Sequence, residues 1–191
     1  FYGFSSFSLT NAGQTIQLKS NNGETISSVT YASNWYNDPV KEEGGWSLEQ
    51  KYAANICSGK ENWTASINNK GGTPATINSV ANNTLLLPQL SKLEVLTDNI
   101  IQLYFNQSMD EELLSNNDLY NVDNNIGSPE YVYTYYDEPE KVELYFENRF
   151  IPGVTYELTI SNNLMNCMLL NLPDDTLVYF GLPDIVTSND I

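Results

Sequence analysis

The sequence contains no histidine, and this absence excludes whole classes of chemistry. A Ser-His-Asp or Cys-His mechanism needs an imidazole as its general base, and many zinc sites need one as a ligand. None of these arrangements can form from the residues of this chain.

Cysteine is almost as scarce, because Cys57 and Cys167 are the two that the sequence contains. Two thiolates are too few for a metal cage built from cysteines. Their spacing fits no known disulfide framework. Two buried free thiols are therefore the simpler expectation, and a single disulfide between the two halves of the chain is the alternative.

Positive charge is also sparse, and the negative charge is unevenly spread. Eight basic residues face 24 acidic ones, for a net charge of −16. Residues 1–90 hold five bases and six acids (5 − 6 = −1), whereas residues 91–191 hold three bases and eighteen acids (3 − 18 = −15). Such a contrast predicts two domains. The excess of acids argues against nucleic acid and anionic membranes as partners, since phosphates are bound by clustered Lys and Arg.

Long hydrophobic runs are missing as well. The apolar runs are short, such as Leu-Leu-Leu at 85–87, so we expect no segment that inserts into a membrane. The chain starts "FYGFSSFSL" without an initiator Met or a basic region, and we interpret it as a processed or excised piece whose signal peptide is not in view. A hydrophobic content of 41% is ordinary for a folded protein.

The residues that are present alternate between apolar and polar in short segments. Residues 15–19 and 25–31 flank a Ser-Asn-Asn-Gly turn, which predicts a β-hairpin. A short helix is expected after Ser108, which we predict as its N-cap, with Glu111 completing a capping box. Five more segments have the period of a half-buried strand, namely 99–105, 131–136, 141–146, 155–160 and 176–180. This spacing is typical of an all-β sandwich.

The first half resembles the C-terminal portion of bacterial lamin tail domains over residues 4–79. The resemblance rests on an opening motif, a strand, a Gly-Gly-x-Ser-Leu-Glu segment and a closing motif. The matching residues are Leu9, Asn11, Gly13, Ile16 and Leu18; Ser28, Val29 and Tyr31; Gly44 to Glu49; and Cys57, Asn62, Trp63, Ser66, Gly71, Gly72, Thr73 and Pro74. The first strands of the family have no counterpart in this sequence.

The second half resembles the bacterial Ig-like domains of surface-layer and other exported proteins, over about residues 92–182. Two motifs carry this resemblance, one around a Met-Asp pair and one around a Gly-x-x-Tyr-x-Leu-x-Ile strand. Their residues are Ile101, Leu103, Phe105, Met109 and Asp110, and then Phe150, Gly153, Tyr156, Leu158 and Ile160.

Together, the two resemblances imply an all-β chain of two consecutive Ig-like β-sandwich domains, the first incomplete at its N-terminus. We expect a lamin-tail-like domain at 1–80, a linker at 81–91, an Ig-like domain at 92–184 and the start of a following segment at 185–191. They imply a non-catalytic structural or adhesive segment of a secreted bacterial surface protein, located outside the cell or in its envelope. Its expected partners are other domains of the same chain and a protein or glycan at the cell surface.

Aromatic residues give the chain its candidate binding sites. Flat rings can stack on sugars or apolar side chains, so a carbohydrate- or peptide-binding accessory module is the alternative function. Its candidate residues are Trp35, Tyr36, Trp46, Tyr133 and Tyr135. The competing expectation is that Tyr131, Tyr133 and Tyr135 face into packing. A structural role is expected for Trp63, over a core, and for Gly71, Gly72 and Pro74, at the exit bend.

Acidic clusters are the remaining candidates for chemistry. Paired carboxylates across a cleft would suit a glycoside hydrolase, which is the weakest of the three hypotheses. We expect no cofactor, and calcium near Asp110, Asp174 or Asp175 is the alternative. The clusters are 110–112, 137–140 and 174–175.

Overall fold

The computed structural model describes residues 8–183 apart from 11, 24, 58, 83 and 137. The predicted following segment at 185–191 lies outside the described residues, and so does Asn11 of the lamin-tail motif. The chain divides into two compact units, unit 1 (Phe1–Leu85) and unit 2 (Leu86–Ile191). The division falls inside the segment expected to be a linker. Both units are built mainly from antiparallel strands, so the all-β fold class predicted from the sequence is confirmed.

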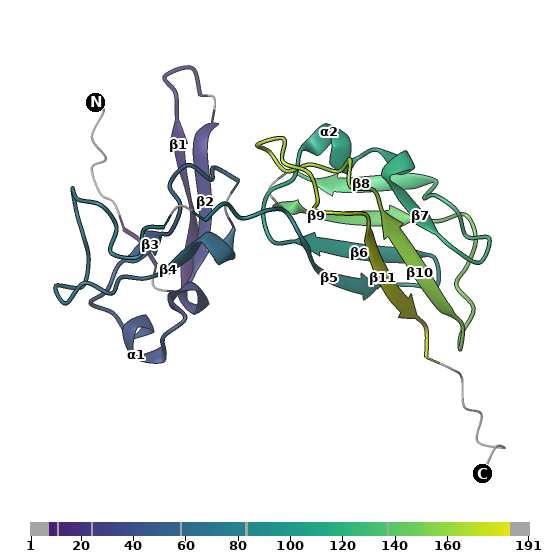
Figure 1. Cartoon of the computed structure of the whole chain (residues 1–191), viewed down its shortest axis with the longest axis horizontal. Helices are drawn as coiled ribbons and strands as arrows, with labels where there is room; N and C mark the ends of the chain where they lie inside the picture. Colours follow the sequence, from purple (N-terminus) through teal and green to yellow (C-terminus); the bar gives the residue numbers. More distant parts are fainter. Residues whose placement is uncertain are drawn as a thin grey trace, which may run out of the picture. The chain divides into compact units, whose positions relative to one another are not determined.

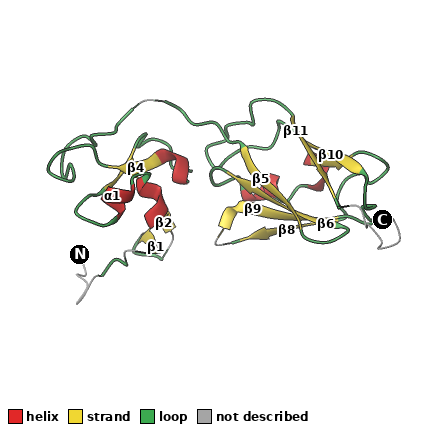
Figure 2. Ribbon diagram, turned by 90° about the horizontal axis from the view of Figure 1, so that it is seen from below, coloured by secondary structure: helices red, strands yellow, loops and turns green. Residues whose placement is uncertain are grey.

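Unit 2 is a β-sandwich of two antiparallel sheets (Figure 1). One sheet has the strand order β5-β6-β9-β8, and the other has the order β11-β10-β7. Figure 2 shows β6, β8 and β9 in one layer and β10 and β11 in another. The strands are β5 (Leu90–Val95), β6 (Ile100–Phe105), β7 (Tyr120–Val122), β8 (Tyr131–Tyr135), β9 (Glu138–Tyr145), β10 (Thr155–Ile160) and β11 (Thr176–Gly181), with the short helices α2 (Glu111–Leu114) and η3 (Asn117–Leu119).

The core of unit 2 is filled by its own side chains. Alternate residues of each strand point inward, as Leu103, Val142 and Leu158 do with no exposed surface. Within this core Phe150 packs edge-on to Phe180, at 5.0 Å between ring centroids. The apolar positions that the alternating pattern assigned to β6, β9 and β10 are buried, because a period of two places every second side chain on the core face.

Unit 1 holds two separate two-stranded antiparallel sheets. The first is the hairpin of β1 (Gly13–Lys19) and β2 (Thr25–Ala32), which confirms the predicted hairpin. The second joins β3 (Leu48–Gln50) to β4 (Trp63–Ala65). Short helical turns connect them, namely η1 (Ser33–Tyr36), α1 (Pro39–Glu42) and η2 (Lys60–Asn62).

The described part of unit 1 is held together by polar groups more than by an apolar core. Its buried hydrophobic residues are Cys57 and Ala65, whereas every member of the main hydrophobic cluster lies in unit 2. The carboxylate of Glu49 is 4% exposed and accepts hydrogen bonds from the Thr73 hydroxyl and from the N–H and hydroxyl of Ser79. Burial alone would raise the pKa of Glu49, but these hydrogen bonds outweigh it and lower the pKa to about 2.

The glycine pair 71–72 is where the backbone of unit 1 closes on itself. Gly71 has φ +83°, and a methyl group there would lie 2.2 Å from the carbonyl oxygen of Gly45. The Ser47 N–H donates to the Gly71 carbonyl at 2.7 Å. Glycine at this position therefore permits both a left-handed backbone and a close approach to the segment before β3.

One local prediction in unit 2 is wrong. Asp110, and not Ser108, is the N-cap of α2, because its side chain accepts a hydrogen bond from the Leu113 N–H at 3.0 Å. The helix starts at Glu111, two residues later than a Ser108 cap requires. Asp and Ser are both good N-caps, so composition alone could not separate them.

Candidate functional site

The outer face of the β5-β6-β9-β8 sheet carries a row of tyrosines, which we name the tyrosine face. Tyr131 and Tyr133 are 56% and 44% exposed, while Val132 between them is buried against the core. The expectation that Tyr131, Tyr133 and Tyr135 face into packing is therefore wrong for the first two, and Tyr135 is half-buried. The strand register adds the outward residues of the neighbouring strands, so the face comprises Lys92, Glu94, Gln102, Tyr104, Tyr131, Tyr133, Tyr135, Lys141, Glu143 and Tyr145.

Glu143 on β9 is at the centre of the tyrosine face. Its carboxylate accepts a hydrogen bond from the Tyr145 hydroxyl at 2.6 Å, one from the Gln102 amide at 2.7 Å and one from the Tyr135 hydroxyl. These donors come from three adjacent strands, so they fix the carboxylate and the tyrosine rings in one arrangement.

The network determines the protonation state of its members. Burial opposes ionisation of Glu143, but the hydrogen bonds from Tyr135, Tyr145 and Gln102 prevail and hold its pKa below the usual range. The same hydrogen bonds to Glu143 raise the pKa of Tyr135 and of Tyr145 to about 12. At neutral pH the hydroxyls of Tyr135 and Tyr145 are therefore neutral and donate to an ionised Glu143.

Two lysines complete the tyrosine face beside Tyr104. The Lys141 ammonium lies 4.0 Å from the ring centroid of Tyr135 and pairs with Glu138 at 2.9 Å. Lys92 pairs with Glu94, which also accepts from the Tyr104 hydroxyl at 3.1 Å. A cation over an aromatic ring and an exposed ion pair each contribute about 1 kcal/mol or less, so these contacts orient side chains more than they stabilise the fold.

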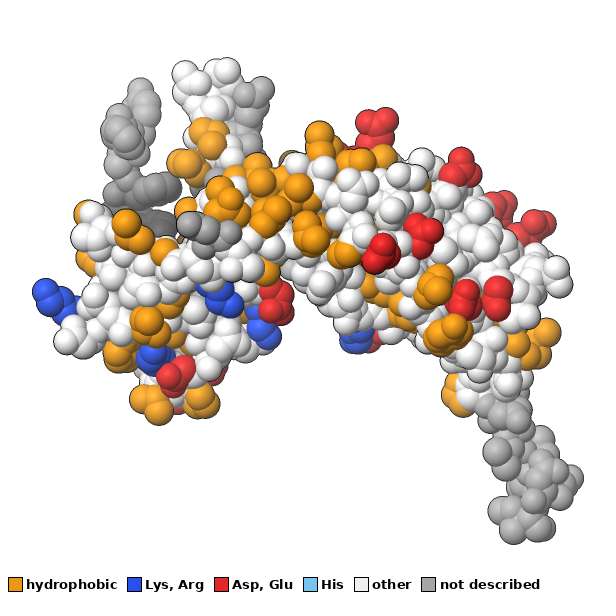
Figure 3. Space-filling model, in the orientation of Figure 1, with side chains coloured by type: hydrophobic (Ala, Val, Ile, Leu, Met, Phe, Trp, Pro, Cys, Tyr) orange, Lys and Arg blue, Asp and Glu red, His pale blue; other side chains and the backbone are white. Residues whose placement is uncertain are grey.

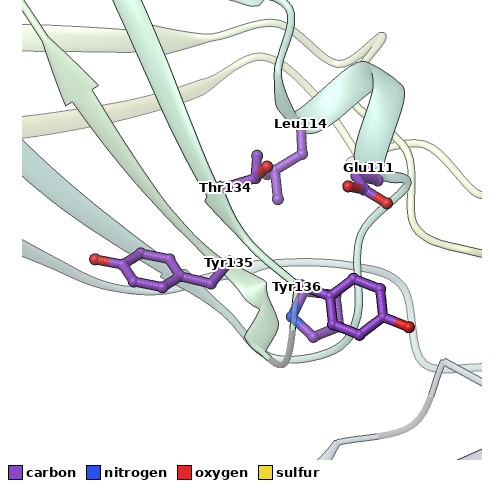
Figure 4. A pocket seen from close by; sticks show the side chains of 6 residues that line it. Glu111, Leu114, Thr134, Tyr135 and Tyr136 are labelled. Carbon is purple, nitrogen blue, oxygen red and sulfur yellow. The ribbon is translucent and has the colours of Figure 1, made fainter.

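A small cavity lies behind the end of β8, on the other side of the sheet from this network. Its volume of about 20 Å³ is enough for a single water. Figure 4 shows Leu114 and Thr134 close together while the ring of Tyr135 extends away from them. The cavity is too small for an organic ligand.

Unit 1 contains a much larger opening, which we name the aromatic hollow. Its volume is about 440 Å³, within the range of small-ligand sites. Residues of both two-stranded sheets line it, and most of them are apolar or aromatic. The lining is Leu9, Thr10, Ile16, Val29, Tyr31, Tyr36, Glu42, Gly44, Trp46, Ser47, Leu48 and Trp63.

Polar contacts hold the aromatic walls of the hollow in place. The Tyr36 hydroxyl donates to the Trp46 carbonyl at 3.0 Å, and the Lys41 ammonium lies 4.7 Å from the Trp46 ring centroid. Burial, with a smaller contribution from Tyr31, raises the pKa of Tyr36. Tyr36 is therefore a neutral hydroxyl at physiological pH and offers the hollow no charge.

Trp63 lies on the wall of the hollow. From the sequence we expected it to pack over a core instead. Its ring is 6.3 Å from that of Trp35, and its indole nitrogen is buried with no hydrogen-bond partner. A buried donor left unpaired costs about 1–3 kcal/mol, so this N–H calls for an acceptor.

The candidate binding residues from the sequence thus separate into two sites. Tyr36 and Trp46 line the hollow, and Trp35 contacts it through Trp63. Tyr133 and Tyr135 lie on the tyrosine face. Sequence reasoning missed Glu143, Gln102 and Glu49. The outward positions of a period-two pattern could have indicated the first two, but nothing local distinguishes Glu49 from other acids.

Two of the acidic candidates, Asp110 and Asp175, have structural roles in the fold. Asp110 caps α2, and Asp175 accepts a hydrogen bond from the Asn162 N–H at 2.7 Å. Asp174 is exposed, and Asp137 lies outside the described residues. Within the described ranges no group of three or more acidic or cysteine side chains is arranged to hold a metal ion.

Neither cysteine is free. Cys57 and Cys167 are both disulfide-bonded, so the expectation of two free thiols is wrong. Disulfides persist in oxidising compartments and are rare in the cytosol.

Charge is distributed over the surface as the sequence indicated. Figure 3 shows acidic side chains spread over unit 2, with most of the visible lysines on unit 1. The part of the chain that the structure describes includes no helix with the length and apolarity that a membrane crossing requires.

Comparison with known proteins gives distant structural similarities. Domains 1–6 of the surface layer protein SbsC match with 12% sequence identity and a TM-score of 0.46, over 53% of this chain and 14% of that one. The N-terminal part of the bacterial S-layer protein SbsC matches with 12% identity and a TM-score of 0.45, over 53% and 24%. Native E. coli alpha-2-macroglobulin matches with 18% identity and a TM-score of 0.41, over 52% and 6%. This chain therefore spans less than a quarter of the length of each.

No protein-family model and no curated protein sequence matches the chain. The lamin-tail resemblance of residues 4–79 is therefore not supported. The similarity to surface-layer domains stays at the level of a distant structural likeness.

Proposed function

We propose that this chain is a non-catalytic structural and interaction segment of an exported bacterial multi-domain surface protein. The observation that carries the proposal is the tyrosine face, on a sandwich with a filled core. Its exposed rings, Tyr131 and Tyr133, contact the rings of Tyr145 and Tyr135. The hydroxyls of Tyr145 and Tyr135 in turn donate to the carboxylate of Glu143. A surface ordered in the free protein loses little side-chain entropy when it binds a partner. The disulfide-bonded cysteines support an extracellular location.

The absence of catalysis is part of this proposal. Glu143 accepts more hydrogen bonds than any other carboxylate on the face, and its three donors stabilise the ionised form. An acid catalyst needs a raised pKa, and the pKa of Glu143 is lowered instead. The resemblance to exported Ig-like domains, which are scaffolding or adhesive, points in the same direction.

A carbohydrate- or peptide-binding accessory module is the second candidate function. The exposed rings of Tyr131 and Tyr133 favour it, because exposed tyrosines beside polar groups can stack on sugar rings while their neighbours bond to hydroxyls. On this face the alternative ligand is a neutral glycan, since unit 2 is strongly acidic.

The experiment is a glycan array with the full chain, followed by incubation of the same glycans and assay for released reducing ends. We expect no hydrolysis with any glycan. Binding that is lost in Tyr133→Ala and kept in Tyr179→Ala, an exposed tyrosine on β11, would promote the accessory-module function. Hydrolysis that disappears in Glu143→Gln would overturn the proposal.

A further inference from the structure

The centre of the tyrosine face combines a carboxylate with an exposed aromatic ring. Tyr133 on β8 lies directly opposite Glu143 on β9 in the strand register, so the two side chains are neighbours on the outer face of the sheet. Tyr133 is 44% exposed, and the pKa of Glu143 is lowered, so Glu143 is ionised at neutral pH. We name these two residues the β8–β9 pair.

Glu143 has an acceptor position left for one more donor. A carboxylate accepts about four hydrogen bonds, two at each oxygen. Oε1 of Glu143 accepts from the Gln102 amide and the Tyr135 hydroxyl, whereas Oε2 accepts from the Tyr145 hydroxyl. These donors are neutral, and no basic side chain of the described residues forms an ion pair with Glu143. A charged donor at Oε2 would therefore gain a strong hydrogen bond.

The lysines of the tyrosine face show which surroundings this face gives a cation. The Lys141 ammonium lies over the ring of Tyr135 and pairs with a glutamate of the same strand. The Lys92 ammonium lies 5.4 Å from the ring centroid of Tyr104 and also pairs with a glutamate. Each cation thus has a ring and a carboxylate. The β8–β9 pair offers the same two groups, and no cation of the described residues lies over its ring.

The charge of unit 2 favours a positively charged partner. Residues 91–191 hold three bases and eighteen acids (3 − 18 = −15). The three bases, Lys92, Lys141 and Arg149, already form ion pairs with acids of the same unit. Such an excess of negative charge attracts cationic partners over a distance and repels anionic ones.

A guanidinium fits the β8–β9 pair better than an ammonium does. It is planar, so it can stack on a tyrosine ring, and it is more weakly hydrated than an ammonium. Its N–H donors lie in a fixed fork, so one of them can reach a neighbouring carboxylate while the plane stays on the ring. The chemistry of the pair is therefore that of a site for an arginine side chain.

We propose that the tyrosine face docks a basic segment of another protein, one arginine of which lies on the ring of Tyr133 and donates to Oε2 of Glu143. The proposal rests on the proposed function, because it names the partner of the same interaction surface. A neutral glycan and a second copy of this chain are the other occupants that the experiment distinguishes.

Titration calorimetry of the full chain with blocked peptides tests the proposal. The probe is Ser-Arg-Gly-Arg-Ser-Arg, used at about 0.15 M salt so that attraction between distant charges is screened. One comparison peptide has lysine in place of each arginine, and another has citrulline, which is planar but uncharged. We expect the lysine peptide to bind about three-fold or more weakly than the probe, and the citrulline peptide about ten-fold or more weakly.

Matched variants locate the binding. We expect Glu143→Gln to weaken binding of the probe by about ten-fold, because it removes a charged acceptor. Asp174→Asn removes the same charge from an exposed acid just before β11, in the other sheet, and should bind as the parent does. Tyr133→Ala should weaken binding by about three- to five-fold. Tyr179→Ala, which changes a 67% exposed tyrosine of β11, should have no effect.

Several results would overturn the proposal. They are no binding of the probe, equal binding of the lysine or citrulline peptide, equal losses in Glu143→Gln and Asp174→Asn, and equal losses in Tyr133→Ala and Tyr179→Ala. Binding of cellohexaose that disappears in Tyr133→Ala would assign the face to a glycan instead. Self-association in sedimentation that disappears in Glu143→Gln would assign it to a second copy.

Failure of this proposal and failure of the proposed function give different results. The proposed function fails if glycans are hydrolysed in a reaction that depends on Glu143, whatever the peptides do. The arginine site fails on the peptide titrations, whether or not hydrolysis occurs. Circular dichroism shows whether each variant folds, and Tyr133→Ala, which changes an exposed side chain, keeps the test decisive if Glu143→Gln does not fold.

Discussion

Glu49 is the residue on which the polar interior of unit 1 depends most directly. Its buried carboxylate joins β3 to the residues around Thr73 and Ser79, in a unit with few apolar contacts. We expect Glu49→Gln to destabilise unit 1 by roughly 3 kcal/mol. The N–H groups of the new amide would face hydrogen-bond donors. The substitution would also remove the favourable hydrogen bonds that lower the pKa of Glu49 from 4.5 to about 2. Chemical unfolding followed by tryptophan fluorescence measures the loss.

The pH dependence of this stabilisation has a definite sign. The folded pKa of Glu49, about 2, lies below the ordinary value of 4.5. The contribution is therefore complete above about pH 4.5 and is lost as the pH falls toward 2. This part of the acid sensitivity should be absent from Glu49→Gln and intact in Glu61→Gln, which changes an exposed acid of the same unit. Equal acid sensitivity of Glu49→Gln and the parent would refute the assignment.

At the residue scale the sequence predicted what depends on local pattern. Ile101, Leu103 and Phe105 are buried as the alternation indicated. The role of Glu49 could not be predicted, because its partners lie 24 and 30 residues away and no short-range rule connects them. The same holds for the convergence of Tyr135 and Gln102 on Glu143.

At the scale of elements, Gly71 passes so close to Gly45 that position 71 has no space for a side chain. Gly71→Ala places a methyl group 2.2 Å from the Gly45 carbonyl oxygen, so backbone must move. We expect a loss of about 2–4 kcal/mol in the stability of unit 1, from the clash together with the strained φ of +83°. Tryptophan-monitored unfolding again provides the measurement.

Gly23 in the β1–β2 turn offers a control that separates these two contributions. It has a similar φ of +88°, but beyond its two chain neighbours no atom of the described residues lies within 4 Å of the position that a methyl group would take. Gly23→Ala should therefore cost about 1–2 kcal/mol from the backbone conformation alone. If both variants lose the same stability, the close approach at Gly71 contributes nothing.

Five of the strands of unit 2 were predicted, because their apolar residues recur with a period near two and each segment ends at a turn. The strands β5 and β7 were not predicted. Residues 155–160 coincide with β10, and 176–180 lie within β11. The short strands β3 and β4 were not predicted. Three residues are too few to show a period, and β4 lies in a stretch of mainly polar residues. The hollow could not be predicted from the sequence either, because its shape depends on how several short elements pack.

At the scale of the whole molecule, the disulfide is the feature most open to direct test. The sequence contains no cysteine besides Cys57 and Cys167, and both are bonded. We expect peptide mapping of the unreduced protein to find a Cys57 peptide linked to a Cys167 peptide, and no reaction with a thiol reagent. Reduction should lower the stability by about 2–4 kcal/mol, measured by denaturant unfolding.

A double Cys57→Ser and Cys167→Ser variant is the control for reduction, because it should match the reduced parent and be insensitive to reductant. A covalent dimer on a non-reducing gel would contradict the expected Cys57–Cys167 linkage. The sequence left this pairing open, since the two cysteines lie 110 positions apart (167 − 57 = 110) and spacing rules apply to clusters of cysteines.

The filled interior of unit 2 and the hollow of unit 1 have a consequence for the behaviour of the chain on heating. A domain with a closed apolar core loses its structure cooperatively. The described part of unit 1 buries few hydrophobic residues and is held mainly by polar contacts such as those of Glu49, so it has less structure to stabilise it. Two separate transitions should follow, with unit 1 melting first, and no single melting temperature would describe this molecule.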